Sequence, residues 1–141
     1  MQVRELMTRD PASAAPSDTL QRAAQLMDDL NVGVLPVIEG GQLRGMLTDR
    51  DIVVRSTSAG QDPRQARVSD AMTDEVRSLP ETADVAEAVA LMESAQIRRL
   101  AVTDGQGQLV GIISLGDLAT SGTGEAAGAL ESISTPSEPD R

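Results

Sequence analysis

The chain has 141 residues and a mass of 14.8 kDa, enough for one domain or for two very small ones. It lacks Cys, His, Trp, Tyr and Phe, and all 12 of its basic residues are Arg, which excludes thiolate and imidazole catalysis, Schiff-base chemistry and a P-loop. Its formal net charge of −10 and its pI of about 4.3 disfavour nucleic acid and anionic membrane surfaces as partners. The charged start and the lack of a long apolar run predict neither a signal peptide nor a transmembrane segment, so we expect a cytoplasmic protein.

The first predicted elements are a helix and a hairpin. The segment Ser17–Thr19 consists of residue types that cap helices, and apolar residues follow it at helical spacing. They share one face of the predicted helix: Leu20, Ala23, Ala24, Met27 and Leu30. Two short apolar runs, VGVLPVI and QLRGMLT, come next and are separated by Glu-Gly-Gly, which is typical of a β-hairpin because Gly supplies the positive φ of the turn. A second helix is predicted to begin at Thr48.

The second half of the chain repeats the first. Val3–Thr8 is echoed by Val68–Thr73, and after a one-residue slip Gly41–Thr48 is echoed by Gly107–Ser114. A helix is predicted after Pro80-Glu81-Thr82 as well, with one apolar face made of Val85, Ala88, Val89 and Met92. With a short extended piece before Pro16 and Pro80, each copy reads β-α-β-β-α, and the copies cover roughly residues 3–55 and 68–120. Each copy is too short to bury a stable core comfortably alone, so we expect the halves to pack against each other.

Two further segments separate or follow the copies. Residues 56–67 are interpreted as a linker. The end of the chain is rich in Gly, Ser, Pro and acidic residues, and residues 122–141 are predicted to be a flexible acidic tail with room for a short helix around 125–131.

One short motif begins the last helix of both copies. Gly45–Asp51 and Gly111–Asp117 each read Gly, two apolar residues, Thr or Ser, two further residues and Asp. One interpretation is a helix cap, because Thr48 and Ser114 suit the N-cap position and an acid three residues later can complete a capping box. The other is a ligand site, in which the hydroxyl bonds a phosphate and the carboxylate accepts both hydroxyls of a ribose. The residues alone leave both interpretations open.

The doubled unit, with its GMLTDRD and GIISLGD segments, resembles a tandem pair of CBS domains, also called a Bateman module. The resemblance extends from Val3 to Thr120, includes the NVGVLPVIE and QIRRLAVTD strands, and is especially marked toward small stand-alone CBS-pair proteins of actinobacteria. It implies an α+β fold of two β-α-β-β-α repeats packed through their sheets with pseudo-two-fold symmetry. CBS domain 1 is then expected over residues 1–60 and CBS domain 2 over residues 61–121.

The resemblance also implies a function and a set of site residues. It implies a non-enzymatic regulatory module that binds AMP, ADP, ATP or S-adenosylmethionine in clefts between the two repeats. In such modules the motif Asp holds the ribose hydroxyls and the Thr or Ser bonds ribose or phosphate. The residues that carry these roles here are Asp51 with Thr48, and Asp117 with Ser114. The residues expected near the adenine are Pro11, Ala12, Val76 and Arg77.

The phosphate end of the two expected sites differs. Arg98 and Arg99 stand where nucleotide-binding relatives carry basic residues that grip phosphate, whereas the first copy has Gly-Val there. The alternative is that both are solvated surface charges. Arg50 is a further phosphate candidate, and Mg²⁺ beside Asp49 and Asp51 is a weaker possibility; no obligatory cofactor is expected. The resemblance therefore predicts two unequal sites.

Two other functions are alternatives to nucleotide sensing. A ligand-free dimerisation and protein-interaction module would use the motifs only as caps. An enzyme using Asp51 and Asp117 as paired carboxylates is disfavoured because the repeat places them in separate, equivalent sites. Since tandem CBS pairs usually dimerise, we expect a homodimer and a regulated protein that is bound in trans.

Overall fold

The computed structural model describes residues 1–74 and 76–120, which belong to two compact units. Unit 1 contains Met1–Asp10, Arg77–Gln106 and the described residues from Val110 onward; unit 2 contains Pro11–Val76 and Gly107–Leu109. The predicted tail at 122–141 and the predicted helix around 125–131 lie outside the described residues.

Unit 2 begins with helix α1 (Leu20–Leu30), which follows the predicted cap. The Thr19 side chain accepts a hydrogen bond from the Arg22 N–H at 3.1 Å, and the helix ends at Asn31 in the left-handed conformation that commonly terminates helices. The predicted apolar face is buried at Leu20, Ala23 and Met27, but it was wrong at Ala24 and Leu30, which are exposed. Ala24 lies at the edge of the apolar stripe and Leu30 is the last helical residue, while Leu26 packs against the core instead.

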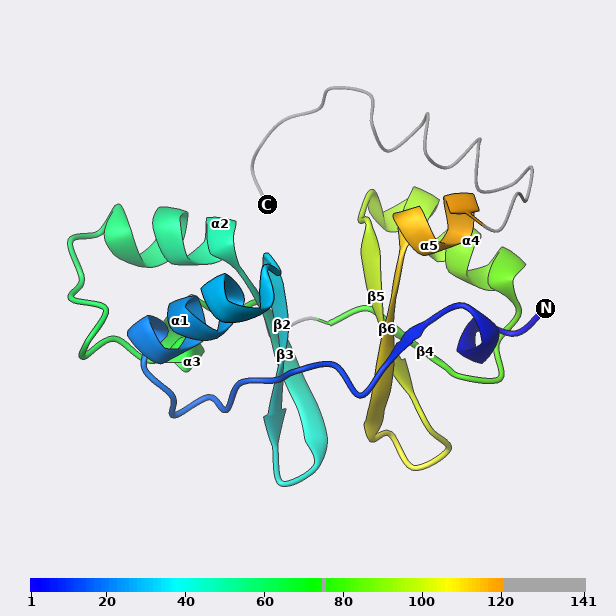
Figure 1. Cartoon of the computed structure of the whole chain (residues 1–141), viewed down its shortest axis with the longest axis horizontal. Helices are drawn as coiled ribbons and strands as arrows, with labels where there is room; N and C mark the ends of the chain where they lie inside the picture. The colour runs from blue at the N-terminus through cyan, green and yellow to red at the C-terminus, as the bar shows by residue number, and fades with distance from the viewer. Residues whose placement is uncertain (75, 121–141) are drawn as a thin grey trace. The chain divides into compact units, whose positions relative to one another are not determined.

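The predicted hairpin follows α1. Strands β2 (Val34–Glu39) and β3 (Gln42–Thr48) pair antiparallel, and both turn glycines have positive φ, 59° at Gly40 and 79° at Gly41. Helix α2 (Asp49–Asp51) begins directly after β3 and continues as the π-helix η2 (Ile52–Thr57), so the first residues of the expected linker are helical. A short helix, α3 (Val68–Ala71), completes the unit, and Figure 1 shows α1, α2 and α3 on the same side of the hairpin.

Unit 1 contains a four-stranded sheet with its helices on one side (Figure 1). Its strands are β1 (Thr8–Arg9), β4 (Ser78–Pro80), β5 (Arg99–Thr103) and β6 (Leu109–Ser114), in the order β1-β6-β5-β4. Its helices are the 3-10 turn η1 (Val3–Glu5), α4 (Val85–Ala95) and α5 (Leu115–Thr120). All four residues predicted for the buried face of α4 are buried: Val85, Ala88, Val89 and Met92.

The two units repeat the same strand pairings. Thr8 pairs with Ile112 in unit 1, and Thr73 forms the matching bridge with Met46 in unit 2. The parallel pair of Leu79 with Val102 is likewise matched by a bridge between Ala14 and Val37. The expected mixed α+β fold with two repeats is therefore confirmed, and the opening segment of each copy packs with the strands of the other copy.

Candidate functional site

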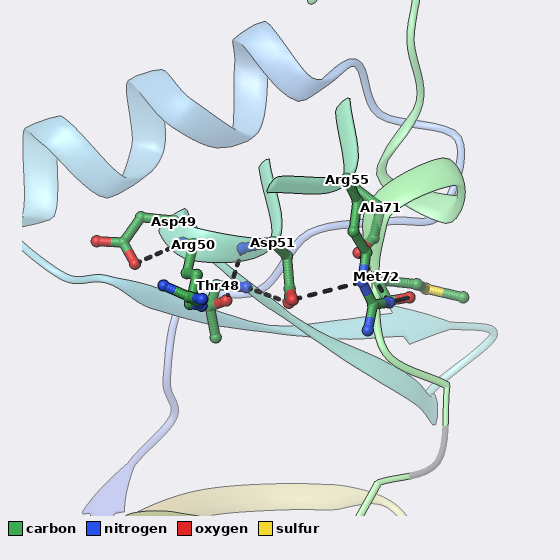
Figure 2. Close-up of polar contacts among 7 residues, drawn as sticks. All are labelled: Thr48, Asp49, Arg50, Asp51, Arg55, Ala71 and Met72. Atoms are coloured by element: carbon green, nitrogen blue, oxygen red, sulfur yellow. Dashed lines mark hydrogen bonds and ion pairs between the residues drawn. The ribbon is translucent and has the colours of Figure 1, made fainter. Parts of the chain in front are cut away.

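The motif of the first copy forms a reciprocal cap at the start of α2 (Figure 2). The Thr48 backbone N–H donates to Asp51 Oδ2 at 3.0 Å, and the Asp51 N–H donates to Thr48 Oγ1 at 3.0 Å. Asp51 is only 7% exposed, which is unusual for a carboxylate and is tolerated because it is hydrogen-bonded and charge-paired. The cap interpretation of the sequence is thus realised in the structure.

The motif of the second copy has the same geometry at the start of α5. The Ser114 N–H donates to Asp117 Oδ2 at 2.9 Å, and the Asp117 N–H donates to Ser114 Oγ at 3.1 Å. Both residues are partly buried. The two copies therefore present a hydroxyl and a carboxylate in one repeated arrangement.

These caps use only part of the polar capacity of each motif. In the reciprocal pair each hydroxyl acts as an acceptor, and a hydroxyl can also donate one hydrogen bond. A carboxylate has about four acceptor positions, and the pair uses Oδ2 but not Oδ1. Capping and the binding of a vicinal diol are therefore chemically compatible in the same motif.

Arg55 is a neighbour of the first motif that the sequence interpretation missed. Its Nε lies 3.8 Å from Asp51 Oδ1, and its Nη1 donates to the carbonyl oxygens of Ala71 at 3.4 Å and Met72 at 3.1 Å (Figure 2). The spacing of four residues from Asp51 on a helix is a signal that could have indicated the ion pair. The contacts to residues 71 and 72 depend on tertiary packing and have no local signal.

The other residues predicted for the first site lie in unit 2 with the motif. Pro11 and Ala12 are partly buried, and Ala12 packs against the unit 2 core. Arg50 is exposed at the start of α2, and its backbone N–H donates to Asp49 Oδ1 at 2.8 Å. Val76, predicted for the second site, is also assigned to unit 2.

The remaining residues predicted for the second site lie in unit 1 with the Ser114 motif. The Arg98 carbonyl accepts the Leu115 N–H at 2.8 Å, so Arg98 is fixed next to the first residue of α5. The side chains of Arg98 and Arg99 are exposed, as is that of Arg77, whose carbonyl accepts the Ala101 N–H at 3.4 Å. In the first copy the Gly33 carbonyl takes the place of Arg98 and accepts the Asp49 N–H at 3.0 Å.

Two other polar features of unit 2 do not include the motif residues. A shallow surface depression, open to solvent, is lined by Pro16, Glu39, Arg44, Met72 and Asp74. On the loop after η2, side-chain hydrogen bonds from Arg64 lower the pKa of Asp62, and Asp62 raises the pKa of Arg64 in turn. Both members of this pair are substantially exposed, so it contributes little to the fold.

The described residues contain neither a helix that could span a membrane nor a cluster that could hold a metal ion. Among residues 1–74 and 76–120, no helix is both long and apolar enough to cross a membrane. Within the same part of the chain, no cluster of three or more Asp, Glu, His or Cys side chains is placed to hold a metal ion.

The repeated fold and the repeated motif agree with comparisons to known proteins. The model of the CBS domain family matches the chain twice, over residues 3–57 and 68–122. The chain therefore belongs to the CBS domain family and carries two CBS domains in tandem.

Small CBS proteins are similar to this chain along most of its length. The CBS domain-containing protein YhcV of Bacillus subtilis is 47% identical over 134 residues, which cover 94% of each chain. Hypoxic response protein 1 of Mycobacterium tuberculosis is 35% identical over 117 residues, covering 82% of this chain and 81% of that one. A crystal structure of hypoxic response protein I with two coordinated zinc ions matches with a TM-score of 0.78 at 33% identity, covering 85% and 98% of the two chains. A crystal structure of CBSX2 in complex with AMP matches with a TM-score of 0.75 at 26% identity, covering 86% and 95%.

Proposed function

We propose that this CBS pair is a cytoplasmic, non-enzymatic regulatory module that binds an adenosine-containing ligand through its two motifs. The observation that carries the proposal is the hydroxyl and carboxylate pair that both copies hold in the same geometry, Thr48 with Asp51 and Ser114 with Asp117. Each pair matches the chemistry of a ribose, because the carboxylate can accept from both hydroxyls while the Thr or Ser hydroxyl donates.

Capping alone does not account for the use of this pair twice. Helices α1 and α4 are equivalent in the two copies, yet α1 is capped by Thr19 alone and α4 by Asp84 with Glu87. Different combinations of residues can therefore cap the first turn of a helix in this chain. Among the helices of residues 1–74 and 76–120, only the two motif helices combine a hydroxyl N-cap with Asp three positions later, which supports a shared role in addition to capping.

The two proposed sites are unequal. In the second copy Arg98 is fixed by its backbone beside the start of α5, and the exposed Arg98 and Arg99 side chains offer charge for a phosphate. The first copy has Gly33 in the matching place and relies on Arg50. The AMP bound by the related CBSX2 supports AMP as the first ligand to test. Mg²⁺ would accompany only a ligand with a polyphosphate.

The absorbance of the purified protein gives a direct test. Because the chain has no Trp, Tyr, Phe or Cys, the apoprotein has almost no near-ultraviolet absorbance, and an adenine band is visible against it. If a nucleotide is held tightly through purification, the purified protein is expected to show an adenine band, and the adenine passes a filter only after the protein is denatured. We also expect calorimetric titration with AMP to show saturable binding. A protein that shows no adenine band and binds none of AMP, ADP, ATP and S-adenosylmethionine would contradict the proposal and favour the ligand-free interaction module.

We also infer that the module signals as a homodimer, in which a bound ligand stabilises one arrangement of the domains and thereby shifts its population. A protein regulated in trans would read that arrangement. Light scattering at micromolar concentration is expected to give the mass of two chains. A mass of one chain under these conditions would refute the dimer.

A further inference from the structure

Arg55 joins two parts of unit 2 that are distant in sequence. Its Nε faces Asp51 Oδ1 at 3.8 Å, while its Nη1 donates to the Ala71 and Met72 carbonyls. The last carbonyls of a helix have no partner within the helix, and α3 ends at Ala71, so Arg55 supplies a C-terminal cap from 16 residues away. One guanidinium thus contacts both the motif carboxylate and the end of α3 (Figure 2).

The segment at the end of α3 is docked by backbone hydrogen bonds at both of its ends. Residues 68–73, defined here as the docking segment, bury Val68 and Ala71. At the start of the segment the Val68 N–H donates to the Asp18 carbonyl at 2.8 Å and the Ser69 N–H donates to the Pro16 carbonyl at 3.0 Å. At its end Thr73 and Met46 of β3 exchange two backbone hydrogen bonds of 2.9 Å each. The Met72 N–H donates to the Val68 carbonyl at 2.9 Å. The amide hydrogens of Met72 and Thr73 exchange with solvent when the docking segment opens, so their exchange rates report its docking.

The sequence places an arginine four residues after the motif Asp in the first copy and not in the second. The residue four positions after Asp117 is Ser121, which has no cation, whereas the residue four positions after Asp51 is Arg55. The helices also differ in this region, because residues 52–57 form a π-helix and the residues matching its start, Leu118–Thr120, remain α-helical. π-Helical turns are frequent at functional sites.

We propose that Arg55 is a positioning residue that couples the Asp51 carboxylate to the docking segment. The Arg55 guanidinium, held by its hydrogen bonds to the Ala71 and Met72 carbonyls, orients Oδ1 of Asp51. Asp51 in turn keeps Arg55 in place beside these carbonyls. This regulatory meaning rests on the proposed function: a ribose at Asp51 stabilises the docked segment, and by linkage the docked segment strengthens ribose binding.

A double-mutant cycle on the ligand-free protein tests the coupling. The variants are Asp51→Asn, which keeps an acceptor for the Thr48 N–H but removes the charge, Arg55→Met, and the double substitution. Amide exchange of Met72 and Thr73 by NMR is expected to rise about tenfold in Arg55→Met and about threefold in Asp51→Asn. In the Arg55→Met background, Asp51→Asn should add nothing. If Arg55 only caps α3, Asp51→Asn will leave both rates unchanged in either background, which overturns the proposal.

Arg64→Met is the matched control, because Arg64 is another unit 2 arginine paired with an Asp, and its side chain bonds to Asp62 outside the docking segment. Its exchange rates at Met72 and Thr73 should equal those of the unchanged protein.

The second arm adds AMP at saturation, as judged by calorimetry for each variant. AMP is expected to slow exchange of Met72 and Thr73 in the unchanged protein at least twofold and to have no such effect in Arg55→Met. Equal slowing in both proteins would overturn the ligand-linked role of Arg55. Absence of AMP binding by the unchanged protein would refute the proposed function, whereas the ligand-free cycle decides the coupling itself.

Discussion

Gly45→Ala is expected to lower the free energy of unfolding by about 3 kcal/mol. A Cβ built on Gly45 would lie 2.6 Å from the Thr73 carbonyl oxygen and 3.1 Å from Met72 Sδ. The carbonyl belongs to the backbone that bridges to β3, where it accepts the Met46 N–H at 2.9 Å, so it cannot move away without breaking that bond. Urea unfolding followed by far-ultraviolet circular dichroism measures the change, since the chain has no aromatic side chain to follow.

Gly105→Ala provides the control. A Cβ at Gly105 would meet no atom within 4 Å, and this residue is not among the glycines with positive φ. The substitution should change the free energy of unfolding by no more than about 0.5 kcal/mol. Equal unfolding midpoints for the two variants would show that the docking segment moves aside at little cost, and the close packing against β3 would then not matter for stability.

Much of this fold was predictable from the sequence because its signals are local. The cap at Thr19, the Gly-Gly turn and the hydroxyl at Thr48 each determine structure within a few residues of themselves. The face of α4 was also correct, because Val85, Ala88, Val89 and Met92 recur at helical spacing and all four are buried. The face of α1 was wrong at Leu30, because the helical period does not show where the core ends.

The exchange of opening segments between the copies had no comparable signal. Val3–Thr8 and Val68–Thr73 are alike, and a repeat does not tell which copy's strands its first segment will join. The glycines at the start of the motifs mark where the opening segment of the other copy packs, but this meaning is visible only in the structure. At both Gly45 and Gly111 an added Cβ would lie within 3 Å of the backbone of the incoming segment, which is a tertiary reason for a residue that the sequence shows only as part of a motif.

In the candidate site, too, the local contacts were predictable from the sequence and the distant ones were not. The pairing of Thr48 with Asp51 and of Ser114 with Asp117 follows from the capping-box spacing and was predictable. The cap made by Arg55 on the carbonyls of Ala71 and Met72 was not, because it joins segments 16 and 17 residues apart.

Asp117→Ala is expected to weaken AMP binding at the second site about 100-fold or more. The carboxylate would accept two hydrogen bonds from the ribose hydroxyls, and each hydrogen bond to a charged group is worth about 1.5–3 kcal/mol. The stability cost should be much smaller, about 1 kcal/mol, because only the bond from the Ser114 N–H and its favourable place at a helix start are lost. Calorimetric titration with AMP and urea unfolding on the same sample measure the two effects.

Glu87→Ala separates the ribose role from the cap. Glu87 occupies the same third helical position in α4, within the same unit, and its carboxylate accepts the Asp84 N–H at 3.1 Å. It should lose a similar amount of stability and bind AMP like the unchanged protein. Asp117→Asn adds a second comparison, because the amide oxygen can still accept the Ser114 N–H but the negative charge that strengthens the ribose contact is gone. If Asp117→Ala and Glu87→Ala bind AMP equally well, Asp117 acts only as a cap; if Asp117→Asn alone keeps its stability but loses AMP, the charge itself holds the ribose.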